Sequence, residues 1–221
     1  MATEQLLSKL KEELLLMASL AERSLKESVK AIVDRDDKIA EKVQADDSEI
    51  DRLEVSIEEM VVTYIATHAP VAKDCRLMLV LTRICGNLER IGDESVTIAR
   101  RAVELNAEPP LKPLIDIPRM ASLAQEMLRD ALQAFIREKP DEMQKLIQRD
   151  KIVDAINKQL ARELTSYMIE KPATITRALN LMTVSKSIER IADHAKNIAE
   201  EVYYLHLGTD IRHQQLVSKT D

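Results

Sequence analysis

Four pairs of acidic residues, each with its members four positions apart, are the part of this sequence that could carry chemistry. Residues at this spacing lie on one face of a helix, so each pair places two carboxylates side by side. Grouped carboxylates are the ligands that hard cations such as Mg²⁺, Ca²⁺, Mn²⁺ and Fe³⁺ prefer. The four pairs are Asp47 and Asp51, Glu89 and Asp93, Asp150 and Asp154, and Glu189 and Asp193.

The positions of these pairs relative to two prolines distinguish them from chance. The chain has 38 acidic residues, so about six pairs at this spacing are expected at random, and a single pair is an ordinary solvated helix face. The first two pairs, however, are centred at equal distances on either side of Pro70, and the other two lie almost symmetrically about Pro172. A turn at each proline would bring two pairs to the same height on neighbouring helices. Four carboxylates held this close repel one another unless cations neutralise them, which favours a metal site.

Residues beside the acidic pairs differ between the two predicted sites. His194 and Asn197 could extend the second site, whereas the first has Glu94 in place of the histidine. Arg90 and Arg190 follow the first acid of each motif, and we expect them to point outward, where they could pair with Glu94 or with a partner protein. The two sites therefore need not hold the same number of ions.

No arrangement typical of an enzyme accompanies the acidic pairs. The sequence has no glycine-rich phosphate loop and no Ser-His-Asp or Cys-His set. The Glu-x-x-His motif of oxidase-like di-iron bundles is also missing. We therefore expect that the protein is not an enzyme.

Long helices must hold these pairs in place, and the apolar pattern predicts six of them. Apolar residues recur every three or four positions, and breaks at Pro70, Pro140 and Pro172 divide the pattern. The proline-rich segment "NAEPPLKP" separates the first three helices from the last three. The predicted helices cover residues 6–32, 36–68, 77–103 and 114–138, and then extend to about Glu170 and to about His206.

The two halves of the chain repeat one plan. "LERIGDESVTIARR" and "IERIADHAKNIAEE" align without a gap at an offset of 100 residues. Three long helices joined by short turns are antiparallel neighbours that close a core along their shared length. We therefore predict an all-α fold of two tandem three-helix bundles, with six long antiparallel helices. The first bundle would occupy residues 1–108, and the second, with a short C-terminal tail, residues 109–221.

Composition agrees with a helical globular protein and excludes several classes. Apolar residues make up 45% of the sequence and aromatic residues 2%, and three glycines leave few positions for tight hairpins. The net charge of −6 comes without a basic stripe, so we expect no nucleic-acid partner. No segment approaches about 18 consecutive apolar residues and the N-terminus lacks a signal-peptide pattern, so we expect a cytoplasmic protein.

Several stretches resemble the PhoU family, the accessory regulators of bacterial phosphate uptake. They are the two repeats "ERIGDESVTIARR" and "ERIADHAKNIAEEV", the segments "DRDDKIAEKV", "DDSEIDRLE" and "HAPVAKDCRLMLVLTRICGNLERIGD", and the C-terminal "GTDIRH". The resemblance covers nearly the whole chain and is closest to stand-alone members. It implies two three-helix bundles, as the pattern does, and multinuclear metal clusters bound by all eight carboxylates of the four pairs. The implied ion is Fe³⁺, with Zn²⁺, Mn²⁺ and Mg²⁺ as alternatives.

The resemblance also implies a role. The protein would be a non-enzymatic negative regulator of phosphate uptake and of the phosphate-starvation response. When phosphate is plentiful, it would act as an adaptor between the ATPase subunit of the phosphate ABC transporter and the sensor histidine kinase. It would work as a homodimer that meets the membrane only through these partners. Two alternatives remain open, a metal-storing or metal-oxidising helical bundle and a purely structural coiled-coil spacer.

Overall fold

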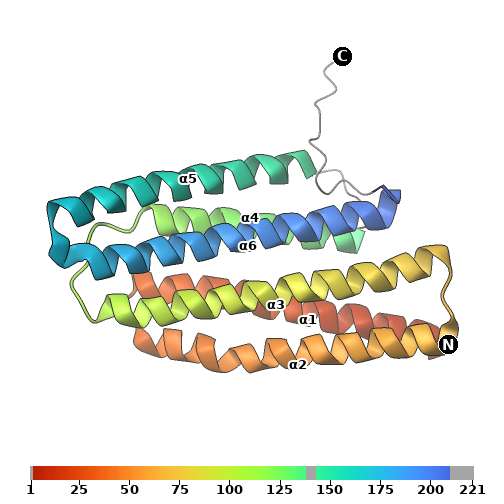
Figure 1. The fold of residues 1–221 in the computed structure, drawn as a ribbon. Coiled ribbons are helices and arrows are strands. Elements are labelled where there is room, and N and C mark those ends of the chain that lie inside the picture. The colour runs from red at the N-terminus through yellow and green to blue at the C-terminus, as the bar shows by residue number, and fades with distance from the viewer. Residues whose placement is uncertain (1, 138–142, 210–221) are drawn as a thin grey trace, which may run out of the picture.

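A computed structural model describes residues 2–137 and 143–209 of the chain, and nearly all of them are helical (Figure 1). This described part contains no strand, which confirms the predicted all-α fold. None of its helices is long and apolar enough to cross a membrane. The predicted break at Pro140 and the last four residues of "GTDIRH" lie outside the described residues. The elements are α1 (Ala2–Val33), α2 (Asp37–His68), α3 (Ala72–Asn106), α4 (Asp116–Arg137), α5 (Met143–Glu170), the 3₁₀ turn η1 (Pro172–Thr174) and α6 (Ile175–Leu207).

A stripe of buried apolar residues explains why each long segment is helical and how it is oriented. In α1 these residues follow one another every three or four positions, which places them on one face of the helix. Packing of this face, more than helix propensity, stabilises a helix in a protein. The fully buried residues at the centre of α1 are Leu10, Leu14, Met17, Ala21 and Leu25.

Tight turns set the register of the two hairpins that carry the acidic pairs. α2 ends at His68, and Ala69 adopts a left-handed conformation, with its N–H donated to the Ile65 carbonyl at 3.2 Å. Pro70 follows directly and prevents the helix from continuing. In the second half the turn is η1, which begins at Pro172. Both hairpins therefore turn at the prolines that the sequence pattern indicated.

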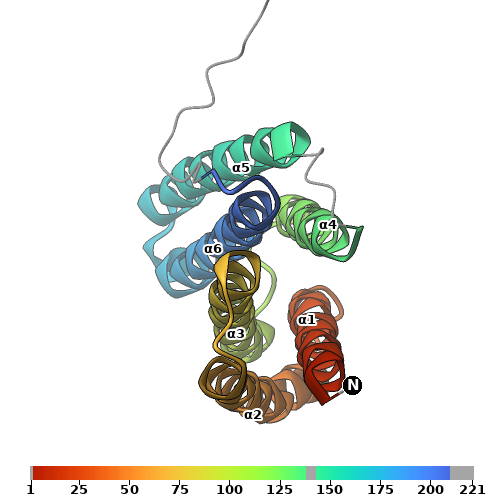
Figure 2. The same cartoon turned by 90° about the vertical axis from the view of Figure 1, so that its right-hand side faces the viewer.

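The two three-helix bundles lie side by side along their whole length. α1, α2 and α3 form one bundle, and α4, α5 and α6 form the other (Figure 1). Seen along the helices, α3 packs against α6, and α1 packs against α4 (Figure 2). The predicted pair of tandem bundles is thus confirmed. The proposed domain boundary between residues 108 and 109 falls in the segment that joins α3 to α4 and stays a prediction.

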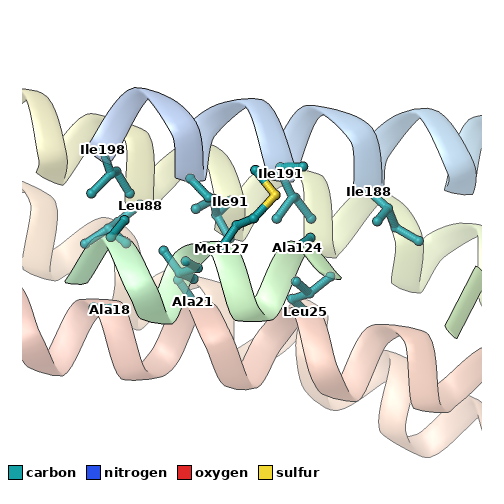
Figure 3. Close-up of a cluster of buried hydrophobic side chains, with 14 of the residues drawn as sticks. Ala18, Ala21, Leu25, Leu88, Ile91, Ala124, Met127, Ile188, Ile191 and Ile198 are labelled. Carbon is teal, nitrogen blue, oxygen red and sulfur yellow. The ribbon is translucent and has the colours of Figure 1, made fainter. Parts of the chain in front are cut away.

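One continuous hydrophobic core joins the bundles and fixes α3 and α6 at the centre of the molecule. An ion pair borders this core, because Arg83 of α3 lies 3.0 Å from Glu201 of α6, whose side chain is almost fully buried. The central helices α3 and α6 also carry the two "ERI" motifs, so the core positions both candidate sites. Figure 3 shows core side chains of four helices, among them Ala21 and Leu25 of α1, Leu88 and Ile91 of α3, Ala124 and Met127 of α4, and Ile188, Ile191 and Ile198 of α6.

The shared core makes a prediction about stability. Ile191 is fully buried between the bundles, so Ile191→Ala should lower the free energy of unfolding by about 2–4 kcal/mol through lost burial and a residual cavity. Ile169→Ala is the matched control, because that side chain is 77% exposed, and it should change the free energy by less than about 0.5 kcal/mol. Urea unfolding followed by circular dichroism measures both. A core common to both bundles would be contradicted by two separate unfolding transitions, one for each bundle, of which Ile191→Ala shifts only that of the α4–α6 bundle.

Candidate functional site

The first carboxylate cluster lies where α2 packs against α3, and Gly92 allows this close approach. A methyl group added at Gly92 would stand 3.0 Å from Oδ1 of Asp47, so the Asp47 carboxylate rests against the backbone of α3. Asp93 is the next residue along α3, which places it level with Asp47. The turn at Pro70 thus brings the two predicted pairs of this hairpin together.

Mutual repulsion and burial perturb the carboxylates of this first cluster. The pKa of Asp47 is raised to about 6, mainly by burial and then by the nearby Asp51 and Asp93, against the opposing effect of Arg100. The pKa of Glu89 is raised to about 7, again by burial first and then by Asp93. Both shifts mean that the folded chain resists carrying all of these negative charges at once.

A further carboxylate, Glu54 of α2, belongs to the first cluster and was not predicted. Burial raises its pKa, and Glu58 and Asp51 add to the shift. Glu54 follows Asp51 by three positions and Asp47 by seven, so all three share one face of α2. Glu54 forms a pair with Glu58 at the spacing of four, but no acidic pair lies at the same distance beyond Pro70, so the symmetry of the pairs does not select it.

Few positive charges reach the first cluster. Among the described residues, its ion pairs come from Arg90, whose guanidinium lies 3.5 Å from Glu89 and 3.7 Å from Asp93. This side chain is 64% exposed, so water screens its charge. Arg90 points outward, as expected, and within the described part of the chain no ion pair reaches Asp47 or Asp51, the predicted ligands on α2.

The second cluster, between α5 and α6, contains its own cations. The ammonium group of Lys196 donates hydrogen bonds to Asp150 of α5 at 2.8 Å and to Asp193 of α6 at 3.0 Å. Burial alone would lower the pKa of Lys196, but these two hydrogen bonds and the charges of the two carboxylates together raise it. Glu189 bonds to Lys186, one turn earlier on α6. Lys158 lies 3.9 Å from the remaining carboxylate, that of Asp154.

His194 and Asn197 join the two bundles and line one pocket with Asp193, so that they could extend the second cluster stays a prediction. Nδ1 of His194 lies 3.0 Å from the side-chain oxygen of Asn87 on α3, and Asn197 donates to the same oxygen at 3.4 Å. Burial is the largest cause of the lowered pKa of His194. Arg190 also crosses to the other bundle, where it lies 3.0 Å from Glu94. These contacts between bundles depend on long-range packing, which the sequence motif does not encode locally.

The two clusters differ in how well they fit a bound metal ion. No three His, Cys, Asp or Glu side chains in the described ranges already surround one point as ligands. The first cluster nevertheless has an excess of carboxylates, whose only ion pair among the described residues is with the exposed Arg90 while Arg100 acts on Asp47 from further away, and this suits a hard cation. In the second cluster ammonium groups already pair with the four carboxylates. Metal binding by the eight predicted ligands stays a prediction.

Comparison with known proteins finds the same family in both halves of the chain. The PhoU domain matches residues 14–102 and again residues 117–202. The phosphate-specific transport system accessory protein PhoU homolog of Pseudomonas aeruginosa is 40% identical over 209 residues, covering 94% of this chain and 86% of the relative. The accessory protein PhoU of Escherichia coli is 33% identical over 207 residues, with coverage of 94% and 86%.

Solved structures agree with these matches. The crystal structure of PhoU from Pseudomonas aeruginosa superimposes with a TM-score of 0.90 at 38% identity, covering 93% of this chain and 99% of that one. The phosphate transport system regulatory protein PhoU from Streptococcus pneumoniae gives a TM-score of 0.85 at 23% identity, which supports the fold alone. Each of the two domain matches coincides with one three-helix bundle.

The raised pKa of Glu89 predicts an unusual pH dependence of stability. The folded chain holds the Glu89 proton more tightly than the unfolded chain, whose pKa is near the usual 4.5. The stabilisation is therefore complete below pH 4.5 and is lost as the pH rises through about 7. Glu89→Gln keeps the neutral form, so it should raise the free energy of unfolding at about pH 8 by about 1 kcal/mol, after solvent screening, and have little effect near pH 5. Urea unfolding in EDTA measures the difference.

Glu189→Gln is the matched control for this prediction, because Glu189 is already paired with Lys186. It should not stabilise the protein at either pH. Equal stabilisation by the two substitutions, or a loss of stability on Glu89→Gln at both pH values, would contradict the repulsion described for the first cluster.

Proposed function

The chain belongs to the PhoU family, and we propose that it is a non-enzymatic negative regulator of phosphate uptake and of the phosphate-starvation response. The observation that carries this proposal is the match of the PhoU domain to both bundles, with relatives named as accessory proteins of phosphate transport over most of their length. These names support a regulatory role over a metal-storing or metal-oxidising bundle. They also support the expectation that the protein is not an enzyme.

As its mode of action we propose an adaptor between the ATPase subunit of the phosphate ABC transporter and the sensor histidine kinase. Exposed apolar side chains at the ends of the two hairpins support docking of two partners. Val62 and Val71 flank the turn between α2 and α3, and Ile169 and Leu179 flank the turn between α5 and α6. The two turns lie at opposite ends of the molecule, so both could be engaged at once (Figure 1). We place this adaptor in the cytoplasm, as a homodimer that reaches the membrane through its partners.

We also propose that the first cluster binds hard metal ions, with Fe³⁺ as the leading candidate and Zn²⁺, Mn²⁺ and Mg²⁺ as alternatives. Asp47, Asp51, Glu89 and Asp93 would hold the metal, with Glu54 beside them. The metal would supply positive charge that links α2 to α3. The residues of the chain would supply the oxygen ligands, and the close approach at Gly92 would keep the ligands of the two helices level.

The adaptor proposal predicts that each hairpin end serves one partner. Two double variants test this, Val62→Asp with Val71→Asp and Ile169→Asp with Leu179→Asp. Each should still capture one partner and should reduce capture of the other at least tenfold. Pull-down of the purified transporter ATPase subunit and of the kinase under phosphate-replete conditions measures this. The control is Leu16→Asp, an exposed apolar position in the middle of α1, which should retain both. Failure of the unsubstituted protein to capture either partner would remove the basis of the proposal.

A further inference from the structure

The internal repeat allows the two carboxylate clusters to be compared position by position. On α3 and α6 the equivalent residues are 100 positions apart, as Glu89 and Glu189 are. On α2 and α5 they are 103 positions apart, so Asp47 corresponds to Asp150. The four carboxylates of the "ERI" hairpins are therefore matched one to one, and any difference between the clusters comes from the residues around them.

Lys196 occupies the centre of the second cluster. Its ammonium group bridges two helices by bonding to Asp150 and Asp193, as a metal ion would if it were held by the same two carboxylates. The side chains of Lys196 and Asp150 are only 25% and 13% exposed, so the pair is largely shielded from water. A charge-assisted hydrogen bond is stronger in such a place than at the surface.

Two more lysines pair with the remaining carboxylates of this cluster. Lys186 donates a hydrogen bond to Glu189, and Lys158 lies 3.9 Å from Asp154, where its exposed ammonium group is screened by water as Arg90 is in the first cluster. All four predicted ligands of the second cluster thus have a lysine beside them.

None of these three lysines has a counterpart in the first cluster. The equivalent positions are occupied by Val96, Gly86 and Val55. The first cluster instead gains a carboxylate, because Glu54 corresponds to Asn157 on α5. Asn157 is neutral and accepts a hydrogen bond from Ser185 at 2.6 Å. The first cluster therefore has five carboxylates, with Arg90 at its edge and Arg100 further from Asp47, whereas the second has four carboxylates and three lysines.

A metal ion could enter the second cluster only by displacing these ammonium groups. A tethered lysine competes at a high local concentration, because it is already held three residues from Asp193 on the same helix. Displacement would also leave a half-buried ammonium group without its two carboxylates, which is unfavourable. The residues of the second cluster therefore do not fit the metal site that the family resemblance implies.

We infer that Lys196, supported by Lys186 and Lys158, closes the second cluster to metal, so that this chain binds metal in its first repeat alone. The asymmetry gives one hairpin a metal-dependent charge and the other a permanent internal cation. The inference rests on the proposed metal binding of the first cluster, but its central part, the closure by Lys196, is testable separately.

Mn²⁺ binding to the full chain tests the inference. The purified protein is stripped with chelator and dialysed against Mn²⁺, and the bound metal is counted by mass spectrometry. Neutralising Glu189 and Asp193 as Glu189→Gln with Asp193→Asn should leave the bound Mn²⁺ unchanged, whereas Glu89→Gln with Asp93→Asn should abolish it. Lys196→Val with Lys186→Ala should add at least one Mn²⁺ per chain, which Asp193→Asn should remove again. Val96→Lys should abolish binding to the first cluster.

Each outcome decides one part of the account. The closure would be overturned if Glu189→Gln with Asp193→Asn lowered the bound Mn²⁺. It would also be overturned if Lys196→Val with Lys186→Ala bound no more Mn²⁺ than the unsubstituted chain. A gain in that variant without binding by the unsubstituted chain would support the closure and reject metal binding by the first cluster.

Thermal unfolding checks that the variants fold and gives a second reading. In EDTA, Lys196→Val should lower the melting temperature by several degrees, and Mn²⁺ should restore it. Lys196→Arg, which keeps the cation, should show neither effect. If Mn²⁺ raised the melting temperature of Lys196→Arg as much as that of Lys196→Val, a role for the cation at this position would be contradicted.

Discussion

The repulsion between carboxylates held on two adjacent helices is the constraint on which the rest of this molecule depends. Helix packing brings acidic side chains of α2 and α3, and again of α5 and α6, to one height. A charged group that is partly removed from water must be protonated, paired or bound to a cation. The second repeat pairs its carboxylates with lysines, although burial still raises the pKa of Asp150, while the first leaves Asp47 and Glu89 with raised pKa values and no buried cation beside them. The same arrangement of helices therefore balances its carboxylates in two different ways.

The shared core explains how this repulsion is tolerated. α3 and α6 are packed on each other at the centre of the molecule, and fully buried residues such as Ile91 and Ile191 lie beside the acidic motifs. Burial of many such side chains supplies far more stabilisation than one repulsive cluster removes. Gly92 increases the electrostatic repulsion in the first cluster, because it allows the Asp47 carboxylate to rest against α3 near Asp93. A cation that links α2 to α3 would relieve it, which connects the proposed metal binding to a hairpin whose end carries exposed apolar residues.

The helices, the turns at Pro70 and Pro172 and the level positions of the acidic pairs were predictable from the sequence, because all of them follow from local spacing. The pairing of charges was not. Lys196 is one of many lysines in the chain, and only its contact with Asp150 on another helix identifies it as the cation of the second cluster. His194 lies beside Asp193 of the second cluster, as expected, but its contact with Asn87 of the other bundle was not predictable, since the packing of α6 on α3 is a long-range property. Glu54 has no symmetric counterpart across Pro70 and so was not selected, although the helical period places it on the same face of α2 as Asp47 and Asp51.

The central claim is that one carboxylate cluster takes a metal ion and the other takes a lysine. Anomalous diffraction from crystals of the full chain grown with Mn²⁺ is the most direct measurement, because it locates the metal without any substitution. The account predicts an anomalous peak beside Asp47, Glu89 and Asp93, and none between Asp150 and Asp193, where the ammonium group of Lys196 lies. A peak of comparable height in both clusters, or one in the second cluster alone, would contradict it.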